Sequence, residues 1–212
     1  MTTGRLRFLL PLLGLAAALI VIDLFVWGPS ALRVVDPMSF GRRFRSWHVE
    51  DEQSPAVLWK VAKAMAIAVT LSIVALRRRA WWPLPWALLF ANLGLVMGTH
   101  YQNRIGDELA ELTGISSGSR WGLLLVALVT GGLVVIGIAG SPQTWATAQL
   151  FVIVVALLGL AAALDFVGDD VDGRRRELAV IHLESAAELG MLTIALVHAV
   201  HLARTPPNTQ AG

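Results

Sequence analysis

The sequence contains no cysteine and has little charge for its length. Without cysteine the chain has no disulfide framework, thiolate metal site, cysteine nucleophile or palmitoyl anchor. Charged residues make up 15% of the 212 residues, whereas soluble globular chains contain about 25%. Because 56% of the residues are hydrophobic, the composition also excludes a disordered chain, a collagen-like repeat and a coiled coil. The sequence therefore predicts a polytopic membrane protein.

Six apolar segments are long enough to cross a bilayer, which requires about 20 helical residues. They cover residues 8–27, 55–76, 81–100, 121–138, 145–164 and 178–202. Ser54 as a helix cap and Pro55 at the first helical position mark the start of the second segment. Seven of the eight tryptophans lie near segment ends, where indole prefers the membrane interface. The prediction is an all-α fold, a single bundle of six transmembrane helices within residues 1–204, followed by a disordered tail at 205–212.

Charge is distributed unevenly between the two predicted membrane faces. The connections after the first, third and fifth segments, with the adjoining segment ends, hold all 15 acidic residues and 11 basic ones, whereas the other face holds 6 basic residues and no acid. The arginine run 77–79 favours termini inside the cell, although the runs 174–176 and 42–45 favour the opposite orientation. We expect a multi-pass protein of the cell (inner) membrane with both termini in the cytoplasm. The first segment lacks a cleavage pattern and is expected to be a retained signal anchor.

The segment 94–112 is predicted to be an amphipathic helix that continues the third span. Helical spacing places His100, Arg104 and Asp107 on one face, and apolar side chains on the opposite face. Gly94 and Gly98 form a GxxxG pattern that allows close approach of another helix. Two interpretations stay open here: a solvated helix face with its own salt bridges, or a site between helices that includes His100 and Asp107.

The last span carries ionisable residues at its start. His182, Glu184 and Glu188 lie within two turns, and Glu188 is the deepest of the three. A carboxylate inside a span costs about 2.5 kcal/mol or more on insertion scales, so it is expected to face the bundle and to mark a functional site. We expect Glu188 to point toward the third span or the end of the first, with His100, Asp23, Arg104 or Arg120 as its partner. A structural packing role is the alternative.

Other chemical motifs are absent or incomplete. The sequence has no Walker loop, dinucleotide fingerprint, HExxH or GxSxG. The acidic loop at 165–172 has a calcium-like D-x-D-G, but its register does not match an EF-hand, because Gly168 and Ala179 occupy two ligand positions. The arginine runs lie beside spans and are interpreted as headgroup anchors, which excludes nucleic acid as a partner.

Three short elements together resemble a functionally uncharacterised group of bacterial six-span membrane proteins. These elements are Glu50-Asp51-Glu52 after the first span, His100 with Asp107-Glu108 after the third, and Glu184-x3-Glu188-Leu189-Gly190 at the start of the last. The second element departs from the pattern of the group, because its histidine precedes the acids. The resemblance implies the six-span architecture and this choice of site residues.

Two functions remain open from the sequence. The first is a non-enzymatic protein: a small carrier, an ion- or proton-binding component, or an accessory subunit. The second is a membrane-embedded enzyme, metal-dependent or acid/base, acting on a lipid or isoprenoid. Glu188, Glu184 and Asp107 are the candidate catalytic residues, and His100, His182 and Glu184 are candidate ligands of a divalent metal ion. The expected partners are the lipid bilayer and either another membrane protein or a second copy of the chain.

Overall fold

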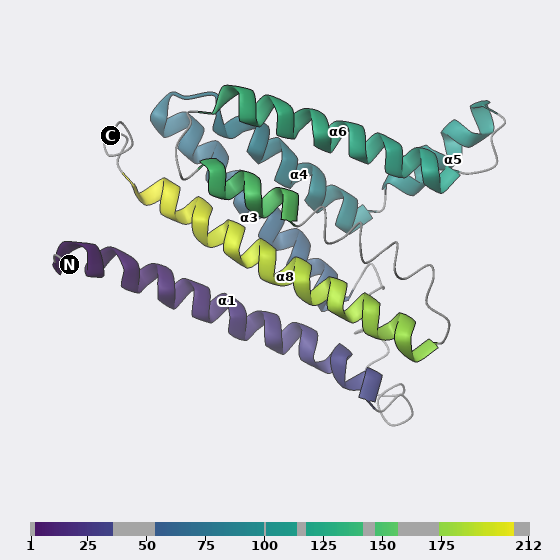
Figure 1. Cartoon of the computed structure of the whole chain (residues 1–212), viewed down its shortest axis with the longest axis horizontal. Coiled ribbons are helices and arrows are strands. Elements are labelled where there is room, and N and C mark those ends of the chain that lie inside the picture. Colours follow the sequence, from purple (N-terminus) through teal and green to yellow (C-terminus); the bar gives the residue numbers. More distant parts are fainter. Residues whose placement is uncertain are drawn as a thin grey trace.

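The computed structural model describes residues 3–35, 54–99, 101–113, 118–141, 147–156 and 174–205. All regular secondary structure in these ranges is α-helical, which confirms the all-α prediction for this part of the chain. The helices are α1 (Thr3–Val35), α3 (Pro55–Arg78), α4 (Pro83–Thr99), α5 (Tyr101–Thr113), α6 (Gly118–Gly140) and α8 (Arg174–Arg204) (Figure 1). A further apolar helical segment, Thr147–Ala156, lies between α6 and α8 in the sequence.

Helix α3 occupies the middle of the arrangement. It packs against α4 on one side and against α8 and α1 on the other, and α8 also packs along α1. Helix α6 packs on α4, so that α1 and α6 lie at opposite edges of the molecule (Figure 1). The buried apolar core joins α3, α4, α8 and the segment Thr147–Ala156 through side chains such as Leu71, Trp86 and Leu192.

Three of the helices are long and apolar enough to cross a membrane: residues Leu10–Gly28 of α1, all of α3, and Ser185–Arg204 of α8. The helices Pro83–Thr99, Leu124–Gly140 and Thr147–Ala156 are apolar but shorter. Many large apolar side chains face outward, including Phe25, Leu76 and Leu128, each more than 60% exposed. An outward apolar surface is compatible with a membrane protein, because lipid is the solvent that such a surface requires.

The predicted start of the second span is confirmed in detail. The Ser54 hydroxyl accepts a hydrogen bond from the Val57 amide at 3.2 Å, and Pro55 is the first residue of α3. Such a cap satisfies one of the free amides at a helix start. At the other end, Arg79 adopts a left-handed conformation with φ 49°, and its amide closes the last turn. The arginine run 77–79 therefore covers the last turn of α3 and its cap.

The GxxxG pattern of α4 acts as predicted, and its partner is α3. A Cβ atom added at Gly94 would lie 3.3 Å from Cβ of Ala64, and one added at Gly98 would lie 3.1 Å from Cγ2 of Val61. Both distances are tighter than ordinary van der Waals contact. The two glycines therefore let the axes of α3 and α4 approach closely, which is the usual role of small residues between membrane helices.

The amphipathic segment after the third span forms helix α5, whose packing partner is α6. Its polar face is exposed as predicted, since Arg104, Asp107 and Glu111 are all exposed. Leu112, expected on the apolar face, is 82% exposed. The acidic segments at 50–52 and 165–172 lie outside the described residues.

Candidate functional site

Two lysines project from α3 into the bundle. Lys60 and Lys63 are three residues apart, so they lie on the same face of the helix. Both residues are buried, with 7% and 1% of their surface exposed. A buried lysine requires a paired charge or a full set of hydrogen bonds. Each of these lysines has an acidic partner on a different helix.

Lys63 forms the inner ion pair, with Asp23 of α1. Its ammonium group also donates to Oγ1 of Thr193 at 2.7 Å and to the carbonyl oxygen of Leu189 at 2.9 Å, both in α8. The three donors of the ammonium group are thus all used. Because the acceptors come from α1 and α8, Lys63 connects three helices.

Two further groups hold the Asp23 carboxylate. The Thr193 hydroxyl donates to its Oδ2 at 2.7 Å, and the Trp59 indole donates to its Oδ1 at 2.7 Å. Thr193 therefore accepts from Lys63 and donates to Asp23, so that the three side chains form a closed ring of hydrogen bonds. The Lys63 ammonium also lies 5.5 Å from the centre of the Trp59 ring, within the range of a cation–π contact.

Lys60 forms the outer ion pair, with Glu188 of α8, at 2.7 Å. The two side chains are 9% and 17% exposed, so this pair is less enclosed than the inner one. Three residues of helix separate the two lysines, a rise of about 4.5 Å. The two ion pairs are therefore stacked along α3, one turn apart.

The depth of the inner pair distinguishes it from an interfacial salt bridge. Lys63 is eight residues from the start of α3, and Thr193 is eight residues from the start of the apolar part of α8. At 1.5 Å per residue, both lie about 12 Å inside these helices. Charged side chains at such depth are costly in lipid, so they face the bundle interior and pair, as Asp23 and Lys63 do.

The expectations for the last span are met in part. Glu188 faces the bundle interior and has a charged partner, as predicted. Its partner is Lys60 of α3, however, and none of the partners expected from the sequence. His182 is buried, and its carbonyl oxygen accepts a hydrogen bond from the Trp27 indole at 3.0 Å, which ties the start of α8 to α1.

Asp107 is the other predicted site residue whose side chain is described, and it is not brought to the ion pairs. Asp107 is exposed on α5, whose packing partner is α6, whereas Glu188 lies on α8 against α3. His100 and the side chain of Glu184 lie outside the described residues. Among the side chains that the structure describes, no group of three His, Asp or Glu residues is arranged to hold a metal ion.

Sequence reasoning missed the two lysines, although a signal was available. The 17 basic residues comprise 15 arginines and only two lysines, and both lysines fall inside the predicted second span. No arginine lies inside any predicted span. Lysine can release its proton inside a protein, whereas arginine stays charged. The segregation of the only lysines into a span therefore indicated a buried site.

Comparisons of the chain with protein-family models, curated proteins and solved structures give no match. The geometry of the two ion pairs is the basis for the function, since Lys60 and Lys63 of one helix meet acids of two others.

Proposed function

We propose that the protein is a six-span membrane protein that binds and releases a proton at the Asp23–Lys63 pair, acting as a small carrier or proton-binding component. The six apolar helical segments within the described ranges support the architecture. The observation that carries the function is the enclosed ring of Asp23, Lys63 and Thr193, deep inside three helices that are each long enough to cross a membrane. Intramembrane ionisable residues in such arrangements are typical of proton relays.

The chemistry of the pair suits proton exchange. A proton added to the Asp23 carboxylate converts it to a neutral acid, and a proton removed from the Lys63 ammonium converts it to a neutral amine. In either case the pair gains or loses one unit of charge and its attraction disappears. Thr193 can support both forms, because a hydroxyl both donates and accepts hydrogen bonds.

Proton binding would also change how the helices are held together. Asp23 is the group of α1 that contacts Lys63, and Lys63 is anchored to α8 through Thr193 and Leu189. Neutralising Asp23 leaves Lys63 with uncharged acceptors only, the carboxyl oxygen of Asp23 and the two groups of α8. Because the ion pair joins α1 to α3, its loss weakens that helix contact and favours a rearrangement of α1.

The outer pair, Lys60 and Glu188, offers the next proton-binding position between the inner pair and the membrane face where α8 begins. Glu188 is five residues, rather more than one turn, closer to that face than Thr193. Its side chain is also more exposed than that of Asp23. Ser185, one turn earlier on α8, is buried and its hydroxyl has no hydrogen-bond partner among the described residues. Glu188, Ser185 and His182 thus place titratable or hydroxyl groups between the inner pair and the start of α8.

Proton flux into sealed vesicles tests the proposal. The purified protein is reconstituted into liposomes that contain a pH-sensitive dye, and valinomycin with potassium removes the membrane potential. After an imposed pH step, we expect the wild type to equilibrate faster than empty liposomes. The variant Asp23→Leu/Lys63→Met, which removes both charges together, should equilibrate at the rate of empty liposomes. A matched control is Thr70→Val, which removes a hydroxyl bonded only within its own helix and should behave as wild type.

The flux assay has a clear contradicting outcome. If the double variant carries protons as fast as the wild type, the inner pair is a structural contact and not the proton site. Equal rates for wild type and empty liposomes would contradict the carrier proposal itself.

A further inference from the structure

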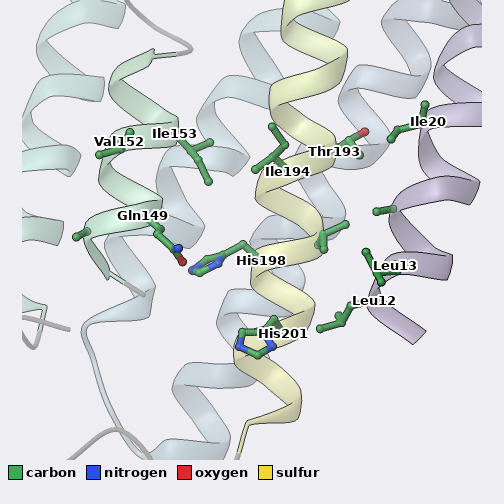
Figure 2. A pocket seen from close by; sticks show the side chains of 13 residues that line it. Leu12, Leu13, Ile20, Gln149, Val152, Ile153, Thr193, Ile194, His198 and His201 are labelled. Carbon is green, nitrogen blue, oxygen red and sulfur yellow. The ribbon is translucent and has the colours of Figure 1, made fainter. Parts of the chain in front are cut away.

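An apolar groove of about 730 Å³ runs along α8, between α1 and the segment Thr147–Ala156 (Figure 2). One face of α8 forms its floor, α1 forms one wall, and the segment Thr147–Ala156 forms the other. The volume falls within the range of about 300–1,000 Å³ that small-molecule sites occupy. Its lining is aliphatic except for four residues, which are Thr193, His198, His201 and Gln149.

The polar residues of the groove are not spread evenly. Thr193 lies at the inner end, near Ile20 of α1, whereas His201 lies toward the other end, near Leu12 (Figure 2). Gln149 points toward His198 from the opposite wall (Figure 2). The two imidazole rings have centroids 6.4 Å apart. The groove is therefore amphiphilic along its length, with hydrogen-bonding groups gathered near the end of α8.

The length of the groove matches one half of a bilayer. Thr193 and His201 on the floor are eight residues apart, and so are Leu12 and Ile20 on the α1 wall. The floor and this wall therefore each extend about 12 Å. One leaflet of the hydrocarbon core is about 15 Å thick, half of the whole core. A single acyl chain that lies beside α8 would thus fill the groove from the headgroup level to the middle of the membrane.

The charge around the histidine end is positive. Arg204 ends α8, and Arg78 donates from α3 to the carbonyl oxygens of Leu202 and Thr205 at 2.6 and 2.9 Å. Arg77 and Arg79 flank Arg78 at the end of α3. Basic pockets between membrane helices bind anionic headgroups. An imidazole N–H can donate to a phosphate oxygen whether the ring is neutral or charged.

We infer that this groove binds one acyl chain of an anionic phospholipid, with the lipid phosphate held at His198 and His201. The chain end lies against Thr193, whose hydroxyl belongs to the ring with Asp23 and Lys63. The bound lipid closes the side of α8 that the described helices leave open. This lipid site stands independently of the proton-binding proposal, because its evidence is the shape, polarity and surrounding charge of the groove.

Lipid retention tests the inference. The protein is purified in mild detergent, mixed with equal amounts of phosphatidylglycerol and phosphatidylcholine carrying the same chains, and examined by native mass spectrometry. We expect the wild type to retain one phosphatidylglycerol in preference. His198→Ala/His201→Ala should bind it about tenfold more weakly, through loss of the phosphate hydrogen bonds. Ala16→Trp, which fills the groove, should retain neither lipid, whereas Ala18→Trp on an exposed side of α1 should behave as wild type.

Competition on the wild type distinguishes an acyl-chain site from a plain phosphate site. Inorganic phosphate and a short-chain phosphatidylglycerol should fail to displace the long-chain lipid. If either displaces it at a concentration comparable to that of the long-chain lipid, only the headgroup is bound and the inference is wrong. Equal retention by Ala16→Trp and Ala18→Trp, or no preference for the anionic lipid, would also overturn it. If Ala16→Trp does not fold, Val197→Phe fills the same groove from α8.

Discussion

The double-mutant cycle at Asp23 and Lys63 measures how strongly the inner pair couples the helices. Asp23→Leu removes the charged partner of Lys63, which is 1% exposed and keeps only the Thr193 hydroxyl and the Leu189 carbonyl as acceptors. Removing one member of a buried ion pair costs about 3–5 kcal/mol, because the other charge stays buried. For a chain of this size the melting temperature should fall by about 6–20 °C.

The other single variant and the double variant of the cycle should differ in stability. Lys63→Met leaves Asp23 with hydrogen bonds from Trp59 and Thr193, so its cost should lie at the lower end of the same range. The double variant Asp23→Leu/Lys63→Met removes both charges, and a buried pair replaced by apolar residues is often neutral in stability. We expect it to melt close to the wild type, so the coupling free energy should approach the sum of the two single costs, about 6–8 kcal/mol.

Intrinsic tryptophan fluorescence during heating in mild detergent provides the assay, since the chain contains eight tryptophans. Thr70→Val is a matched control, because its hydroxyl bonds to the Ala66 carbonyl oxygen of its own helix, and it should melt close to the wild type. Single variants that each melt within about 2 °C of wild type, a change of 1 kcal/mol or less, would refute the reasoning. Additive effects in the double variant would do the same, since they would mean that the two charges do not interact.

Two further predictions concern the outer pair and the packing of α6. Glu188→Gln should fold normally, because the amide oxygen can still accept a hydrogen bond from Lys60. It should slow proton flux in liposomes, because it removes a titratable group from the route to Asp23. An unchanged rate would show that Glu188 is not part of that route. Gly137→Ala places a Cβ 2.8 Å from the Trp86 indole, an overlap that should cost about 1–3 kcal/mol in the thermal assay. Gly131→Ala has nothing within 4 Å and should stabilise the same helix slightly, so equal effects of the two substitutions would contradict the close contact.

Local features of the fold could be predicted from the sequence because local physics determines them. The Ser54–Pro55 start of α3 depends on a hydrogen bond between residues only three positions apart and on the fixed φ of proline. The Gly94–Gly98 contact depends on a four-residue repeat that leaves one helix face without side chains. Apolar runs also placed the described helices, since length and hydropathy are properties of the chain alone.

The partners within the site could not be predicted in the same way. Asp23 and Lys63 are 40 positions apart, and Lys60 and Glu188 are 128 positions apart. Which residues meet depends on how each helix is rotated about its axis, and packing against neighbouring helices determines this rotation. The pattern predicted that Glu188 faces the bundle, but it favoured the third span or the end of the first as the neighbour, whereas α3 lies opposite that face.

The hydrogen-bond partners of the tryptophans could not be predicted from the sequence either. Trp59 and Trp86 lie near helix starts, where an interfacial role was expected, yet both indoles donate hydrogen bonds inside the bundle, to Asp23 and to the Ser141 hydroxyl. An indole at a span end can satisfy its N–H from lipid headgroups or from a neighbouring helix. Sequence position does not distinguish these two outcomes.

The most direct test of the proton site is an infrared difference spectrum of the wild-type protein between alkaline and acidic pH, compared with that of Asp23→Asn. Protonation of a carboxylate creates a carboxylic acid C=O stretch, and an enclosed acid is distinguished from exposed acids by slow exchange in deuterated water. The account predicts a slowly exchanging C=O band in the wild type that is missing in Asp23→Asn and shifted in Thr193→Val. An identical set of bands in wild type and Asp23→Asn would show that Asp23 does not take up a proton, and would contradict the account.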